Sequence, residues 1–250
     1  MGIEIVLLPE ELQNRDISNS LVVIIDVLRA SSTIVTALAE NAVRVIPVFS
    51  PAEARKRAAT LCLENVLLCG ERGGQKLSDF DLGNSPREYI SSQVKDKVVL
   101  LSTTNGVRAI NMTNKAKQII IGCFLNILAV VQYCQYSSNN VLLVCAGDRG
   151  NISLEDTVCA GMIKYLIGVN DCNQSSNYLS SNDDAQIALL LYQQFKDNLR
   201  EMLQTSIWGQ QLIAMGFKRD LIFCAQTNVY NVIPVLKEDN LIIAEHRDKI

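Results

Sequence analysis

Acidic residues and arginines occur close together at several points where an apolar run ends. The pairs are Asp26 with Arg29, Glu71 with Arg72, and Asp148 with Arg149. The other polar candidates, in a further strand-end run and in the segment 75–96, are Asn84, Ser85, Thr103, Thr104, Asn105, Gly106 and Arg108. Carboxylates with amide and hydroxyl neighbours bind hard cations such as Mg²⁺, and arginines bind phosphate, sulfonate or carboxylate groups. The combination predicts a site for a small substrate that carries more than one anionic group.

The segment 22–38 brings such a pair together with hydroxyl groups. Four apolar residues precede Asp26, as in a strand that is buried on both faces of a parallel sheet. Ser31, Ser32 and Thr33 then begin a helical pattern, and a helix N-terminus attracts anions. Asp26 would repel the same anion unless a cation lay between them, which indicates a metal. The alternative is an ordinary strand-to-helix connection in which the hydroxyls only cap the helix.

Catalysis by a histidine has little support, because His246 is the only histidine and lies near the C-terminus. We expect it to be solvated. Phosphoryl transfer needs no histidine when a metal and arginines neutralise charge and a carboxylate acts as nucleophile or base. A single acid–arginine pair is usually an exposed ion pair of no functional meaning, so only the repetition of such pairs at several strand ends indicates a site. Glu155 and Asp156 are expected to serve the N-terminus of their own helix.

The pattern of apolar residues shows how these side chains come together. Strands are expected at 3–8, 21–27, 43–48, 66–69, 98–101, 118–122 and 141–145, and most are followed by a helical stretch. This alternation predicts a three-layer α/β/α fold with a largely parallel or mixed sheet. Ligands of such sheets bind beyond the carboxyl ends of the strands, where the acid–arginine pairs lie.

The C-terminal third follows a different pattern. Helices are expected at 183–202 and 206–215, and strands at Phe223, 229–235 and 241–244 are expected to close the sheet at an edge. The polar stretch 170–184 is a candidate linker. Because it is short, we predict one domain over 1–250, with a possible subdivision near 170–182.

Composition limits the classes of function. The 250 residues are 48% hydrophobic and carry a net charge of −3, which supports a large core and gives no support for nucleic-acid binding. Eight cysteines without a CxxC pair suit reduced, buried thiols better than disulfides or a zinc site. The chain shows no signal-peptide pattern and no apolar run of about 20 residues, so a cytoplasmic protein without a membrane segment is expected. Neither GxGxxG nor a P-loop occurs.

Six segments resemble the 2-phosphosulfolactate phosphatase family, the ComB-like proteins of coenzyme M biosynthesis. They are IDVLRASSTIVTAL (25–38), GERGG (70–74), LGNSPREY (82–89), STTNGVRA (102–109), CAGDRG with LEDTVCAG (145–161) and SIWGQQLIAMGFKRDL (206–221). The resemblance therefore extends over nearly the whole chain. It implies a Mg²⁺-dependent phosphatase that hydrolyses 2-phospho-3-sulfolactate to 3-sulfolactate and phosphate, on a ComB-like α/β fold.

With that activity in view, we assign catalysis to Asp26, Arg29, Glu71 and Asp148. Asp26, Glu71 and Asp148 are expected to hold or surround Mg²⁺, while Arg29 and residues 31–33 bind phosphate. Asp26 is the leading nucleophile, although it cannot be both a tight metal ligand and a free attacker. The substrate-binding candidates are Arg29, Ser31, Ser32, Thr33, Arg72, Asn84, Ser85, Thr103, Thr104, Asn105, Gly106, Arg108 and Arg149.

Two other classes of function remain open from the residues. One is a phosphatase that acts on another small phosphorylated acid, and the other is a non-catalytic anion-binding protein. A homodimer is expected as the commonest assembly.

Overall fold

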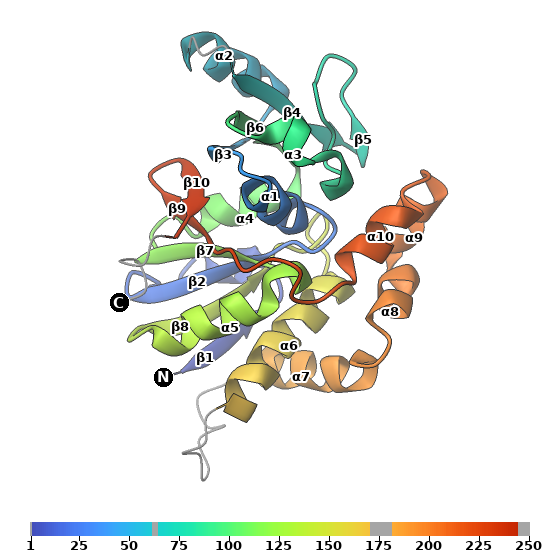
Figure 1. Cartoon of the computed structure of the whole chain (residues 1–250). Coiled ribbons are helices and arrows are strands. Elements are labelled where there is room, and N and C mark those ends of the chain that lie inside the picture. Colours follow the sequence, from blue (N-terminus) through green and yellow to red (C-terminus); the bar gives the residue numbers. More distant parts are fainter. Residues whose placement is uncertain (1, 62–64, 171–181, 245–250) are drawn as a thin grey trace.

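The computed structural model describes residues 2–61, 65–170 and 182–244 (Figure 1). Within these ranges one sheet has the strand order β1-β8-β2-β7-β9-β10-β3-β6-β4-β5. The strand bounds are β1 Ile3–Val6, β2 Ser20–Ile25, β3 Arg44–Val48, β4 Val66–Arg72, β5 Gln75–Lys76, β6 Val98–Ser102, β7 Gln118–Gly122, β8 Asn140–Cys145, β9 Pro234–Lys237 and β10 Asn240–Ile243. His246 and most of the predicted linker lie outside the described residues.

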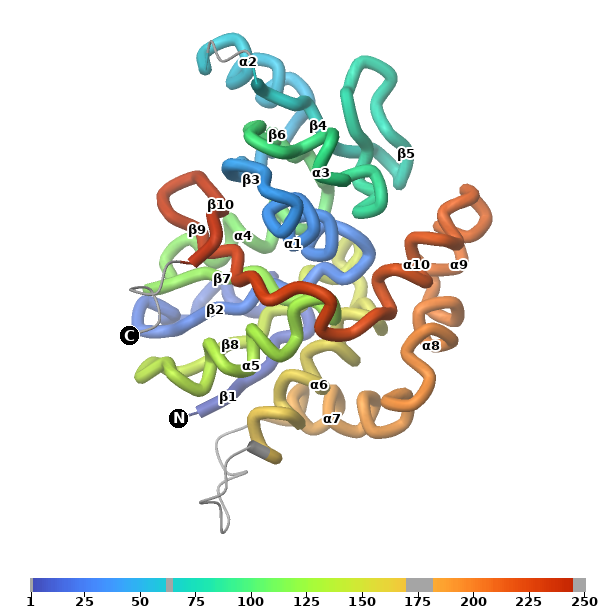
Figure 2. The backbone as a smooth tube through the Cα atoms, viewed as in Figure 1, coloured from blue at the N-terminus to red at the C-terminus, as the bar shows by residue number. Residues whose placement is uncertain are grey.

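The sheet consists of two parallel halves. Strands β1, β8, β2 and β7 are parallel to one another, as are β3, β6 and β4. The hairpin β9–β10 lies between the halves and pairs antiparallel with β7 on one side and β3 on the other. The sequence placed these closing strands at an edge, and that prediction was wrong. After helix α10 (Lys218–Cys224) the chain crosses the molecule between α1 (Ala30–Ala39) and α5 (Ile127–Tyr136) to reach β9 (Figure 2). On this path the Tyr230 N–H donates to Leu125 O.

Helices cover both faces of the sheet, so the predicted three-layer α/β/α fold is confirmed. The α-helices are α1 Ala30–Ala39, α2 Pro51–Leu61, α3 Ser91–Val94, α4 Asn105–Met112, α5 Ile127–Tyr136, α6 Leu154–Asn170, α7 Asp183–Phe195, α8 Leu199–Thr205, α9 Ile207–Ala214 and α10 Lys218–Cys224. Short 3₁₀ turns are η1 Pro9–Leu12, η2 Pro86–Glu88 and η3 Phe124–Asn126.

Strand β2 shows how the sheet packs between its two layers of helices. Leu21, Val23 and Ile25 face the core formed with α5, α6 and the C-terminal helices. Val22 and Ile24 face the opposite core, which contains apolar residues of α1 and α4. Side chains of a strand alternate between the two faces, so a continuous apolar run is what a strand between two helix layers requires. Asp26 comes directly after this strand and lies where the layers end.

The C-terminal helices differ from the prediction in two places. Phe223 belongs to α10 and not to a strand, and the expected helix 183–202 is divided into α7 and α8 by residues 196–198. Ser153 Oγ accepts a hydrogen bond from the Asp156 N–H, as a helix N-cap does, but the Asp156 carboxylate turns elsewhere. The described cysteines are free and buried: Cys69, Cys123, Cys134, Cys145, Cys159 and Cys224.

Candidate active site

Asp26 is buried in the connection from β2 to α1. Its Oδ1 accepts a hydrogen bond from the Ala30 N–H at 3.1 Å, and its own N–H donates to Ser31 Oγ at 2.9 Å. Burial, partly offset by the Ala30 bond, raises the pKa of Asp26 to about 7. The charges of Glu71, Glu155 and Asp148 act in the same direction. Asp26, Glu71, Glu155 and Asp148 are therefore near enough to interact electrostatically, and we call these four carboxylates the acidic cluster.

Glu71 reaches the acidic cluster from the end of β4, and both its oxygens have partners. Oε2 accepts the Gly74 N–H at 2.7 Å, while Oε1 accepts the N–H and the hydroxyl of Thr104 at 3.3 and 3.2 Å. The carboxylate therefore connects the GERGG loop with the N-terminus of α4. The side chain is almost fully buried, so its position is fixed by these bonds.

Gly106 brings α4 close to Asp26. A Cβ atom at this position would lie 2.8 Å from the Ala30 Cβ, 3.1 Å from Asp26 Oδ2 and 3.5 Å from Thr103 Oγ1. Thr103 Oγ1 and Asn84 Oδ1 are buried, and within the described part of the chain neither atom has a hydrogen-bond partner. Buried polar atoms without partners are costly, so Thr103 Oγ1, which lies near Gly106 on the side of Asp26, is suited to bind a ligand.

Asp148 joins the acidic cluster from the loop after β8 and is less buried than Asp26. Its Oδ1 accepts from Asn105 Nδ2 at 3.1 Å, and Asn105 Oδ1 accepts from the Arg149 N–H at 3.2 Å. The Arg149 guanidinium is mainly exposed and lies over the Trp208 ring, 5.8 Å from its centre. The loop thus places one carboxylate in the site and one arginine at its rim.

The three predicted phosphate-binding hydroxyls make hydrogen bonds within the protein. Ser32 Oγ donates to Val27 O at 2.8 Å, and Thr33 Oγ1 donates to Asn84 O at 3.0 Å. Ser31 Oγ accepts from Asp26, as described above. These bonds shape the β2–α1 connection, and a contact of residues 31–33 with phosphate stays a prediction.

Arg29 is buried, and each of its terminal nitrogens donates a hydrogen bond. Nη1 donates to Asp220 Oδ2 at 2.8 Å and Nη2 donates to Gly74 O at 2.7 Å. The guanidinium also lies over the Phe217 ring, 4.3 Å from its centre. Ser85, another predicted ligand residue, donates from Oγ to Asp220 Oδ1 at 2.8 Å. Direct binding of substrate by Arg29 and Ser85 stays a prediction.

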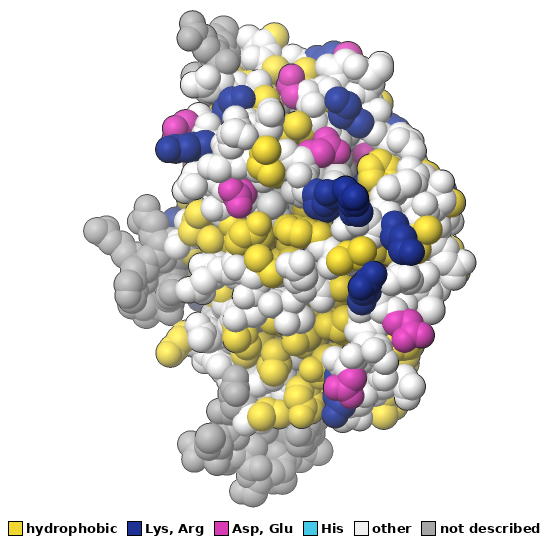
Figure 3. Space-filling model, turned by 45° about the vertical axis from the view of Figure 1, so that its right-hand side comes forward, with side chains coloured by type: hydrophobic (Ala, Val, Ile, Leu, Met, Phe, Trp, Pro, Cys, Tyr) yellow, Lys and Arg dark blue, Asp and Glu magenta, His cyan; other side chains and the backbone are white. Residues whose placement is uncertain are grey.

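The remaining two arginines lie nearer to solvent. Arg72 Nη1 donates to Glu71 O at 2.8 Å, and its Nη2 approaches Ser102 Oγ at 3.3 Å. Arg108 pairs with Glu10 at 2.8 Å and donates to Ala146 O at 3.2 Å. Figure 3 shows several Lys and Arg side chains gathered on the face that includes the side of α9 and α10.

Sequence reasoning underrated three buried carboxylates. Glu155 belongs to the acidic cluster, and burial raises its pKa. Asp156 accepts the N–H groups of Val27 at 2.8 Å and Gly147 at 3.3 Å, so it ties together the loops that carry Asp26 and Asp148. Burial and the nearby charges of Asp26 and Glu155 raise its pKa well above the usual value. Asp220 was not singled out, although the segment 206–221 had carried part of the resemblance.

The acidic cluster has the oxygen donors that Mg²⁺ prefers. Within the described ranges, however, no group of three or more His, Cys, Asp or Glu side chains is arranged so that it could hold a metal ion. Mg²⁺ usually keeps several waters and binds through one or two carboxylates, so the donor chemistry fits this ion without a three-carboxylate chelate. The assignment of Asp26, Glu71 and Asp148 as metal ligands stays a prediction.

The fold and the site define an α/β protein whose buried carboxylates and rim arginines converge at the carboxyl ends of strands, as in proteins that bind small polar ligands there. A family model described as 2-phosphosulpholactate phosphatase matches residues 6–239. The chain belongs to the 2-phosphosulfolactate phosphatase family.

Curated relatives agree with this assignment. A protein of Pseudothermotoga lettingae is 44% identical over 96% of this chain and 98% of its own length. A protein of Thermotoga petrophila is 40% identical over 89% of this chain and 92% of its own. A third, from Caldanaerobacter subterraneus, is 35% identical over 90% and 91%. Each is named probable 2-phosphosulfolactate phosphatase. Among the described residues no helix is long and apolar enough to cross a membrane.

Proposed function

We propose that this protein hydrolyses 2-phospho-3-sulfolactate to 3-sulfolactate and phosphate. The observation that carries the proposal is the acidic cluster around Asp26 in a chain that belongs to this family along nearly its whole length. The substrate carries phosphate, sulfonate and carboxylate groups on a three-carbon frame. A rim with Arg72, Arg108 and Arg149 supplies positive charge for such a molecule.

The proposed cofactor is Mg²⁺, held through one or two of Asp26, Glu71 and Asp148 together with water. Support comes from the electrostatics of the acidic cluster, because burial and, to a smaller extent, the neighbouring carboxylates raise the pKa of Asp26. A bound cation would favour the ionised carboxylates and offset their repulsion. When bound, Mg²⁺ would polarise the phosphate and neutralise charge that develops in the transition state.

Asp26 is proposed as the residue that acts on the phosphate, either as nucleophile or as base. Its Oδ1 is engaged by the Ala30 N–H, while Oδ2 lies on the side of Gly106 and Thr103. Thr103 is proposed to donate a hydrogen bond to the substrate, since its buried hydroxyl lacks a partner among the described residues, and Asn84 is proposed to contact the substrate through its side-chain amide. Water is limited at this position because Asp26 is only 8% exposed.

We propose a cytoplasmic enzyme of coenzyme M biosynthesis that acts as a homodimer, with no nucleic-acid partner. The absence of excess positive charge supports the last point.

Phosphate release tests the proposed activity. The protein is incubated with racemic 2-phospho-3-sulfolactate, phosphoglycolate or phospholactate, each with and without Mg²⁺. We expect Mg²⁺-dependent turnover with a preference for the sulfonate. Turnover of the other esters alone would keep the phosphatase chemistry and remove the coenzyme M assignment. No turnover by the folded protein in Mg²⁺ would contradict the proposal.

A further inference from the structure

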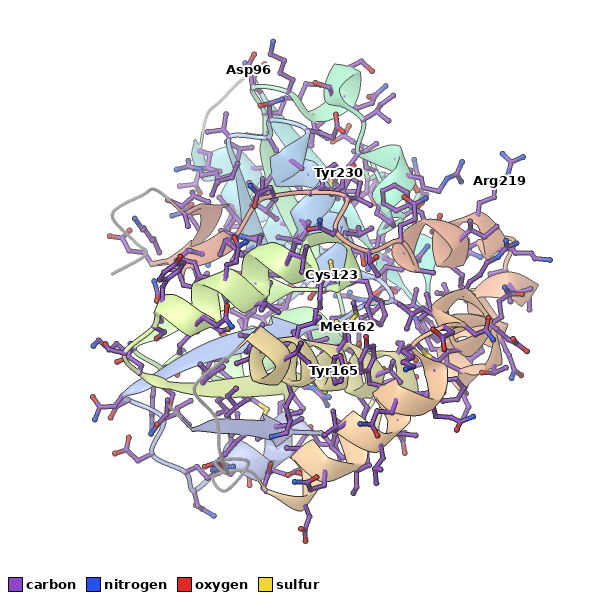
Figure 4. The ribbon with its side chains drawn as sticks, turned by 60° about the horizontal axis from the view of Figure 1, so that its bottom comes forward. Asp96, Cys123, Met162, Tyr165, Arg219 and Tyr230 are labelled. Atoms are coloured by element: carbon purple, nitrogen blue, oxygen red, sulfur yellow. The ribbon has the colours of Figure 1, made fainter. Side chains whose placement is uncertain are left out.

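Asp220 is a buried carboxylate outside the acidic cluster that contacts several segments of the chain. It lies in α10 with 1% of its surface exposed, whereas its neighbour Arg219 points outward from the helix (Figure 4). Its Oδ2 accepts from Arg29 Nη1, and its Oδ1 accepts from Ser85 Oγ, both at 2.8 Å. Arg87 approaches the same Oδ1 at 4.0 Å. Asp220 therefore pairs with Arg29, the residue directly before α1, and also holds the NSPRE segment through Ser85.

The contact continues from Arg29 into the GERGG loop. Arg29 Nη2 donates to Gly74 O at 2.7 Å, and the Gly74 N–H donates to Glu71 Oε2 at 2.7 Å. Both polar groups of one glycine residue are thus held, the carbonyl by Arg29 and the N–H by a carboxylate of the acidic cluster. Gly74 has a φ of +87°, and a Cβ there would lie 2.8 Å from the Met215 side chain. The loop is consequently confined between Arg29, Glu71 and Met215, the residue directly after α9.

The direction of Glu71 depends on this arrangement. Its other oxygen, Oε1, accepts from Thr104 at the start of α4. If Arg29 moved, the Gly74 carbonyl would no longer be held in place. The Gly74 N–H, which orients Glu71 Oε2, would then be free to shift. The Phe217 ring, which comes one residue before α10, lies against the Arg29 guanidinium and limits its movement. Asp220 and Phe217 therefore connect α10 and the residue before it with the site through Arg29.

We propose that Asp220 is a positioning residue for the phosphatase reaction: it fixes Arg29, which holds Gly74 so that Glu71 faces Asp26. This inference rests on the proposed function, because it assigns Glu71 a role in that reaction. Asp220 itself touches no part of the acidic cluster. Its effect is expected on the rate of the chemical step, since misplacing a catalytic group by a small distance costs rate.

The test compares Asp220→Asn with the matched control Asp79→Asn. Asp79 also pairs with an arginine, Arg55, at 2.7 Å, but both side chains are about half exposed. We expect kcat of Asp220→Asn to fall about tenfold to a hundredfold with KM changed less than about threefold, because positioning and not binding is lost. Asp79→Asn should keep both constants. A kcat within about twofold of the wild type would overturn the proposal.

A second measurement separates this inference from the proposed activity. Amide hydrogen exchange over residues 70–76 should be faster in Asp220→Asn than in the wild type and unchanged in Asp79→Asn, whether or not the wild type turns over the substrate. Unchanged exchange would overturn the proposal, and an inactive wild type would contradict only the proposed function. If Asp220→Asn does not fold, Asp220→Glu keeps the charge with a longer side chain and is judged by the same two criteria.

Discussion

Asp26 and Arg29 lie three positions apart in the same connection, and both are buried, yet their surroundings are opposite. Arg29 has a carboxylate, a carbonyl and an aromatic ring as partners. Asp26 has other carboxylates near it, and burial and their charges raise its pKa to about 7. Arg29 is thus paired with an opposite charge, whereas Asp26 lies among like charges.

The difference suggests a structural role for one of these residues and a role in the reaction for the other. A charge that is buried and fully paired contributes to the arrangement of the chain around it. Carboxylates that are buried beside one another are retained against their repulsion, as is common at catalytic sites. We therefore propose that Asp26 takes part in the reaction and that Arg29 supports the site. The following predictions test this division.

The largest effect is expected from Asp26→Asn. The amide has nearly the same shape and can still accept from the Ala30 N–H, but it cannot act as nucleophile or base. We expect kcat to fall on the order of a thousandfold, with circular dichroism like that of the wild type. A variant that keeps most of the wild-type kcat would remove Asp26 from the chemistry.

Arg29→Ala tests the other side of the comparison. It leaves Asp220 buried with its main partner missing, so the free energy of unfolding should fall by about 3–5 kcal/mol. Urea unfolding measures the change. The control is Arg55→Ala, which breaks the exposed pair with Asp79 and should cost less than about 1 kcal/mol. Similar losses in the two variants would show that the buried Arg29–Asp220 pair stabilises the fold no more than the exposed Arg55–Asp79 pair does.

Gly106→Ala tests how closely α4 approaches Asp26. The added methyl group would lie 2.8 Å from the Ala30 Cβ and 3.1 Å from Asp26 Oδ2. We expect a loss of about 1–3 kcal/mol in the free energy of unfolding, together with a lower kcat, because α1 and α4 must separate. Unfolding in urea and initial rates check the two effects. A fully active, equally stable variant would mean that the contact is easily relaxed.

Arg108→Ala is expected to have the smallest effect. Arg108 is at the rim, where it pairs with Glu10, so it suits a remote anionic group of the substrate. KM should rise about tenfold with little change in kcat, measured by initial rates over a range of substrate concentration. A loss confined to kcat would place Arg108 at the reacting phosphate.

The alternation of strands and helices could be predicted because it depends on local patterns. Asp26 and Glu71 could be placed at strand ends for the same reason. The central place of the β9–β10 hairpin could not, since strand order depends on contacts between distant segments. Asp220 escaped notice because its partner Arg29 is 191 positions away. Phosphate binding by residues 31–33 stays a prediction, and the sequence could not show that Ser32 Oγ donates to Val27 O and Thr33 Oγ1 to Asn84 O, because the second of these bonds joins distant segments.

The stability of the wild type and Asp26→Asn as a function of pH, in the presence of a chelator, tests the account most directly. The folded-state pKa of about 7 lies above the ordinary 3.8, so the folded protein retains a proton that the unfolded chain releases. Wild-type stability should therefore fall as the pH rises from about 4 to 7, by up to about 4 kcal/mol. We predict that Asp26→Asn is the more stable protein at pH 8 and that its advantage disappears near pH 4. An Asp26→Asn protein that is less stable than the wild type at pH 8 would contradict the account.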